Sequence, residues 1–305
     1  MQGFTRGIIN YLKEVGSMKS IVFSIVLVLS ICIACSAPAQ LTLYDDFSGP
    51  FVDTDRWYHR TFMGDDVWAY EGGFKIVKGK LNYFNRAYGA LLNTDLTQVV
   101  KRQMFFKDIR YIKGMGASIQ VVKNGYAINN VCPSENAVPS ETRIYIGGPF
   151  FNDGTGPGSG NAFGDIAAYL GFYKFSDSTD IPPGYMGVRA RLRKCTNDDC
   201  STNDVILGKE TLFNNVLVKI GQKILLRITW NKAAKTFTFN VGKKVVDTLT
   251  YTEDDSRPPE HVIGNARIAI DHYLANCPGL EGSPRSVGWA DILVDYVSVD
   301  PTVWP

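Results

Sequence analysis

Arginine and tyrosine side chains alternate with apolar ones along three segments of the chain, 143–146, 165–173 and 187–193. Successive side chains of a strand point to opposite faces, so each segment predicts a strand with one apolar and one polar face. Tyrosine rings stack on sugar faces, and arginine forks bind carboxylates or sulfates. If these strands are neighbours, the polar residues predict a site for an acidic polysaccharide. They are Arg143, Tyr145, Asp165, Tyr169, Tyr173, Arg189, Arg191 and Arg193.

The same polar faces allow two other interpretations. A tyrosine could serve as the acid or base of a polysaccharide lyase, with an arginine neutralising the uronate. In the simplest interpretation the residues form a solvated sheet face, where long side chains cover the strands and pair with aspartates.

The N-terminus has the pattern of an export signal. An apolar run at 21–34 follows Lys19 and precedes the small-residue site Ala37-Pro38-Ala39, which predicts cleavage before Gln40. Met18 is an alternative initiator. Two alternatives are a retained membrane anchor and an outer-membrane lipoprotein acylated on Cys35. We therefore expect a periplasmic, extracellular or cell-surface protein whose membrane contact, if any, is through this leader.

Charge and histidine content exclude other classes of function. The chain has 32 basic and 30 acidic residues, and removing residues 1–39 leaves 29 of each, because three basic residues and one acidic residue lie in the leader. Such a balance does not favour nucleic acid or an anionic membrane as a partner. Three histidines in 305 residues argue against a multi-histidine metal centre.

Four cysteines follow the leader, and an oxidising compartment favours pairing them. Cys195 and Cys200 enclose a short loop and form the most local pair, which leaves Cys132 to pair with Cys277. A zinc site is the alternative, but the spacing lacks a Cys-x-x-Cys motif.

Strand patterns predominate from residue 40 to residue 305 and predict one all-β domain of about twelve strands. Residues 225–230 and 235–241 predict a hairpin with Phe237, Phe239 and Val241 inward, and Trp230 belongs to the core. Two short strands flank Lys78-Gly79. The segment 94–110 is ambiguous, since Leu96, Val99 and Val100 could share a helical turn.

Several segments together resemble the concanavalin A-like lectin/glucanase superfamily. They are Asp45-Asp46-Phe47 with Trp57, the strand at Gly79-Lys80-Leu81, the hairpin from Leu226, and the closing run Ile292–Val299. The resemblance implies an antiparallel two-sheet jelly roll whose concave sheet often binds a glycan. The glucanase branch carries Glu-x-Asp-x-x-Glu on one strand, and this sequence has no such run.

The resemblance also implies a structural calcium ion. Similar sandwiches often bind one through an aspartate of the last strand, which here is Asp295, placed between Leu293 and Val297 on the face expected to be inward. Asp46 would contribute to the same oxygen shell. The alternative is a plain salt bridge.

These observations predict an exported, disulfide-bonded, non-catalytic β-sandwich that binds carbohydrate or associates with a surface. One alternative is a polysaccharide-degrading enzyme, either a glycoside hydrolase or a lyase, with an unrecognised site. The other is a structural envelope protein that binds other proteins.

Overall fold

A computed structural model describes residues 41–63, 69–88, 97–127, 139–156, 160–198, 200, 205–207, 211–260, 266–275 and 287–301. These residues form sixteen strands and include no helix. Accordingly, none of them lies in a helix long and apolar enough to cross a membrane. The predicted leader and Cys35 lie outside the described residues, so export and lipidation stay predictions.

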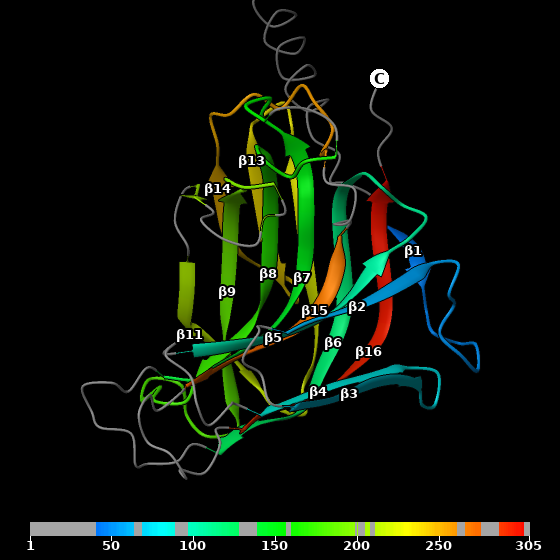
Figure 1. Ribbon diagram of the computed structural model, residues 1–305, viewed down its shortest axis with the longest axis vertical. Helices are drawn as coiled ribbons and strands as arrows, with labels where there is room; N and C mark the ends of the chain where they lie inside the picture. Colours follow the sequence, from blue (N-terminus) through cyan, green and yellow to red (C-terminus); the bar gives the residue numbers. More distant parts are fainter. Residues whose placement is uncertain are drawn as a thin grey trace, which may run out of the picture. The chain divides into compact units, whose positions relative to one another are not determined.

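The strands form two antiparallel sheets (Figure 1). The first has the order β14 (Lys244–Thr250), β13 (Thr236–Val241), β12 (Lys223–Asn231), β6 (Ile112–Ala127), β16 (Val287–Pro301), β4 (Leu81–Tyr88) and β3 (Ala69–Ile76), with β1 (Thr42–Asp45) on β16. The second has the order β10 (Val205–Ile206), β9 (Tyr185–Lys194), β8 (Asp165–Phe175), β7 (Glu141–Asn152), β15 (Arg267–Ala275), β5 (Thr97–Phe106) and β2 (Trp57–Met63), with β11 (Thr211–Lys219) on β9. This confirms the predicted all-β, two-sheet antiparallel jelly-roll sandwich.

One core lies between the sheets and follows the period-two pattern of the sequence. Ile166, Ala168, Leu170 and Phe172 of β8 are buried in it, together with Phe237 from the opposite sheet. Trp230 stacks on Phe151 and Phe237 at ring-centroid distances of 5.2 and 6.2 Å, which confirms its place in the core.

Local turn chemistry also agrees with the sequence. Lys78 and Gly79 both have positive φ between β3 and β4, a conformation that glycine adopts without a steric cost. The predicted hairpin is formed by β12 and β13, with Asn231 opposite Thr236.

Two segments with indecisive sequence patterns form strands. The ambiguous segment at 94–110 contains strand β5, because it pairs with β15 on one side and β2 on the other. Strand β6 runs to Ala127, past Asn124 and Gly125, which are common turn residues, and pairs there with β16. In both places pairing with distant strands decides the structure.

The core becomes polar toward one end. His272 of β15 is fully buried, with Thr142 Oγ1 2.8 Å from its Nδ1 and the Asn85 carbonyl oxygen 3.1 Å from its Nε2. Burial lowers the pKa of His272 to about 4, although the bond to Asn85 acts in the opposite direction. The imidazole is therefore neutral near pH 7.

This lowered pKa predicts acid sensitivity. In the unfolded chain His272 takes up a proton near pH 6.5, whereas the folded protein resists protonation until about pH 4. Stability should therefore fall as the pH drops through this window, by about 3 kcal/mol from this residue. Chemical unfolding at several pH values, compared between the wild type and His272→Gln, checks the slope. Parallel curves for the two proteins would contradict the assignment.

Candidate functional site

The outward face of the second sheet collects the alternating arginine and tyrosine residues. Strands β9, β8, β7 and β15 lie side by side in that order (Figure 1). Their register places Arg191 opposite Tyr169, Tyr169 opposite Gly147, and Gly147 opposite Arg267. In the next row, Arg189 lies opposite Gly171, Gly171 opposite Tyr145, and Tyr145 opposite Ala269. We call this surface the arginine–tyrosine face; its polar members are Arg143, Tyr145, Tyr169, Tyr173, Arg189, Arg191 and Arg193 with Glu141, Arg267, Asp271 and Tyr273.

Glycines make room for the tyrosine rings on this face. A Cβ at Gly147 would lie 2.8 Å from Tyr169 Cδ1, and a Cβ at Gly187 would lie 2.7 Å from Tyr173 Cε1. These distances are shorter than real Cβ contacts, so each ring packs directly on the backbone of the neighbouring strand. The rings of Tyr145 and Tyr169 meet edge to face at 5.4 Å.

Glu141 joins two of the arginines. Its carboxylate accepts a hydrogen bond of 2.5 Å from Arg143 and one of 2.6 Å from Arg189. Arg143 also donates to the Tyr273 hydroxyl at 2.9 Å and lies over its ring at 4.0 Å. Burial tends to lower the pKa of Arg143, but Tyr273, Glu141 and Asp271 outweigh it and raise the pKa. The arginine is therefore charged at any physiological pH.

Asp271 lies beside Arg143 on the neighbouring strand. Its Oδ2 accepts a hydrogen bond of 3.0 Å from the Tyr145 hydroxyl, which itself accepts one of 3.2 Å from Gln103. Burial raises the pKa of Asp271, against the effects of Lys101, Arg143 and Arg267. Burial also raises the pKa of Tyr145 well above its usual value, and Asp271 adds to this. Asp271 and Tyr145 therefore form a hydrogen-bonded carboxyl–phenol pair.

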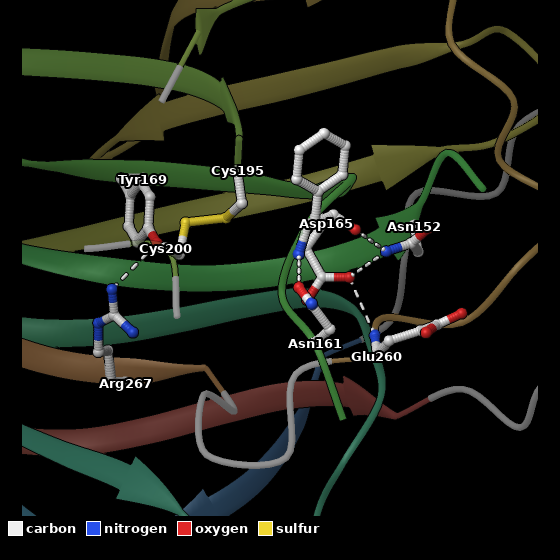
Figure 2. The surroundings of a disulfide bond; sticks show 9 residues. Asn152, Asn161, Asp165, Tyr169, Cys195, Cys200, Glu260 and Arg267 are labelled. Carbon is white, nitrogen blue, oxygen red and sulfur yellow. Dashed lines mark hydrogen bonds between the residues drawn. A yellow bond between two sulfur atoms is a disulfide. The ribbon is translucent and has the colours of Figure 1, made fainter. Parts of the chain in front are cut away.

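Arg267 and Tyr169 form a second polar pair. Figure 2 shows Arg267 pointing toward Tyr169, whose hydroxyl accepts a hydrogen bond from it at 3.0 Å. The Arg267 guanidinium also lies 5.3 Å from the ring centroids of both Tyr169 and Phe105. Tyr169 remains partly exposed, so its aromatic surface lies beside the guanidinium groups of Arg267 and of Arg191 on the neighbouring strand.

Two predicted site residues have structural roles instead. Tyr173 is 1% exposed and packs against Arg189 at 5.1 Å, so its ring is not an open platform. Asp165 is also 1% exposed, and its Oδ1 accepts hydrogen bonds from Asn152 Nδ2 and from the Glu260 backbone nitrogen (Figure 2). Asp165 therefore holds loops at the end of β8.

The predicted disulfide between Cys195 and Cys200 is present (Figure 2). The backbone around it is also bonded, since Cys195 exchanges hydrogen bonds with Asp165 and Gly164 at 2.9 Å each. Cys132 and Cys277 lie outside the described residues, so their pairing stays a prediction.

Removing this disulfide should cost about 2 kcal/mol of stability. The bond closes a loop with a sequence separation of 5, and a short loop restricts the unfolded chain only modestly. Urea unfolding of the double variant Cys195→Ser, Cys200→Ser measures the loss and leaves Cys132 and Cys277 untouched. A loss above about 5 kcal/mol would show that the bond does more than close this loop.

Asp295 does not point inward as predicted. A β-bulge between Val294 and Tyr296 interrupts the alternation of β16, so Val294 and Val297 are both in the core while Asp295 lies outside. Its carboxylate pairs with Lys223 at 3.0 Å and Lys80 at 3.3 Å, and these lysines lower its pKa.

The surroundings of Asp295 do not fit a calcium ion, because two ammonium groups already hold its oxygens. Asp46 uses its carboxylate to accept a hydrogen bond from the Ser48 backbone nitrogen. No group of three or more His, Cys, Asp or Glu side chains suited to a metal occurs among the described residues. Calcium at Asp46 and Asp295 stays a prediction without support from this geometry.

Sequence reasoning missed the carboxylates of the site. Glu141 begins β7, and Asp271 and Arg267 belong to β15. Residues 267–271 do alternate, which marks a strand with polar Arg267 and Asp271 on one face. Nothing in that pattern shows that the strand lies beside β7.

No family model matches the sequence, and no curated protein sequence matches it. The fold is similar to LamAcat from Zobellia galactanivorans, with 12% identity, a TM-score of 0.44 and coverage of 85% of this chain and 97% of that chain. It is also similar to a laminarinase from Flavobacterium sp. UMI-01, with 14% identity, a TM-score of 0.42 and coverage of 85% and 99%. A third similar structure is the catalytic domain of an endo-1,3-β-glucanase from Thermotoga petrophila RKU-1, with 7% identity, a TM-score of 0.44 and coverage of 86% and 98%.

Proposed function

We propose that this protein binds an acidic polysaccharide along the arginine–tyrosine face. The observation that carries the proposal is the run of guanidinium groups on this face beside the partly exposed rings of Tyr145 and Tyr169. These guanidinium groups belong to Arg143, Arg189, Arg191, Arg193 and Arg267. Guanidinium groups pair with carboxylates and sulfates in fork geometry.

Partly exposed tyrosines supply the second element of recognition. Tyr145 and Tyr169 lie among the arginines, where a sugar ring can stack on an aromatic surface while its acidic group meets a guanidinium. The face therefore favours uronate or sulfate-bearing chains over neutral ones.

Arg191→Ala combined with Tyr169→Ala should weaken binding to alginate or polygalacturonate at least tenfold, because both anchors are lost. Calorimetric titration of the purified full chain measures the affinity, which should also fall as the salt concentration rises. Arg86→Ala is the matched control, since Arg86 is an exposed arginine of the other sheet and pairs with Glu71. Equal affinity for neutral laminarin, or full affinity in the double variant, would contradict the proposal.

Cleavage of the bound polysaccharide is a second candidate function. The observation that favours it is the contact between Asp271, whose pKa is raised by burial, and the Tyr145 hydroxyl at 3.0 Å, since a carboxyl and a phenol are groups that acid–base catalysis uses. Release of reducing or unsaturated ends from the bound polysaccharide tests this candidate. Asp271→Asn should then abolish the release and preserve binding. Binding without product release contradicts catalysis and leaves the binding proposal intact.

A further inference from the structure

Arg102 is a buried cation on the inner face of strand β5. It lies in register with Ile270 and shares the core-facing side of β5 with Val100 and Met104. The residue is 6% exposed. Within the described part of the chain its guanidinium makes no hydrogen bond or ion pair, and its Nε is completely enclosed. Arginines in protein interiors normally have partners, because an unpaired buried charge is costly.

Other buried polar atoms near Arg102 also lack partners. Tyr83 of β4 is fully buried, lies within electrostatic reach of Arg102, and has no hydrogen bond to its hydroxyl from any described residue. Asn85 lies on the same face of β4 and donates to the Ile270 carbonyl oxygen at 3.3 Å. Its Oδ1 accepts nothing within the described ranges. The Arg102 guanidinium and the Tyr83 hydroxyl are donors without acceptors among the described residues, and such buried donors call for an occupant that supplies acceptors.

The surroundings of Arg102 are neutral or cationic. Strand β3 closes over the side chain at Gly72, where a Cβ would lie 3.0 Å from Arg102 Cζ, so a larger residue would displace the guanidinium. His59 of the adjacent strand β2 is partly buried, and burial together with the charge of Arg102 lowers its pKa to about 4. Burial lowers the pKa of Arg102, and Tyr83 and Tyr70 act to raise it. No carboxylate of the described residues contributes to the shift.

We propose that Arg102 and Tyr83 bind a small oxyanion between the edges of the two sheets. The guanidinium presents paired N–H donors that match a carboxylate, sulfate or phosphate, and the Tyr83 hydroxyl adds a third donor. The unpartnered Oδ1 of Asn85 is an acceptor and takes no part in binding the anion. This site is separate from the arginine–tyrosine face. Gln103 contacts Tyr145 of that face, whereas Arg102 projects to the opposite side of β5.

Inorganic sulfate and the His59 imidazole provide a local test. The chain has three histidines, so their NMR signals are few, and His59→Gln identifies the relevant one. Titration of the full chain with sulfate at constant ionic strength should shift the His59 signal in a saturable way. A parallel titration with acetate distinguishes a planar carboxylate from a tetrahedral anion as the preferred ligand, and saturation with either supports the site.

Variants assign the response to Arg102. Arg102→Met should abolish the shift of the His59 signal. Tyr83→Phe, which removes a single oxygen atom, should weaken the binding of the anion about tenfold. Tyr83→Phe keeps the test valid if Arg102→Met does not fold. Arg86→Met and Arg191→Ala should respond as the wild type does. A response that is absent in the wild type, or unchanged in both Arg102→Met and Tyr83→Phe, overturns the proposal.

Discussion

Replacing Glu141 with glutamine is expected to lower the free energy of unfolding by about 3 kcal/mol. The Glu141 side chain is 5% exposed and bridges Arg143 and Arg189, whose side chains are 18% and 10% exposed. Glutamine keeps the shape of the side chain but not its charge, and its amide group can present N–H to a guanidinium that needs an acceptor. Arg143 and Arg189 would then remain buried without the negative charge that offsets theirs. Urea unfolding monitored by tryptophan fluorescence measures the loss.

Glu71→Gln is the matched control for this experiment. Glu71 pairs with Arg86 at 3.2 Å, but these side chains are 60% and 50% exposed, so solvent already screens their attraction. The same chemical change should therefore cost less than about 1 kcal/mol. If the two variants lose equal stability, Glu141 does not hold the arginines of the face, and their placement depends on other contacts.

Replacing Phe237 with alanine is expected to cost about 3–5 kcal/mol. Its ring is fully buried at the centre of an aromatic cluster, 4.9 Å from the ring of Phe150 and 5.7 Å from that of Tyr251. Truncation removes buried apolar area and leaves a cavity that the rigid rings around it cannot fill. Thermal and urea unfolding both report the change.

Phe51→Ala is the control for truncating an aromatic ring. Phe51 is 84% exposed, so its removal should change stability by no more than about 0.5 kcal/mol. A loss at Phe237 below about 1 kcal/mol would show that the cluster repacks, and the core would then be less rigid than its ring contacts imply.

The amino-acid sequence by itself determined the local features of this protein. Alternation along 165–173 and 187–193 specified which side chains enter the core, because the side-chain period of a strand is two and a slip of one residue would bury arginines. Lys78-Gly79 and the Asn231 turn specified two hairpins, because their geometry depends on neighbouring residues only. The short Cys195–Cys200 loop was predictable for the same reason.

Only the tertiary structure decided which strands become neighbours. Strand β15 lies about 120 residues after β7 in the sequence, yet it brings Asp271 and Arg267 to the arginine–tyrosine face. A bulge in β16 turned Asp295 outward to two lysines, and the approach of β3 enclosed Arg102. Each outcome depends on long-range pairing and packing, which the period of a single segment does not encode.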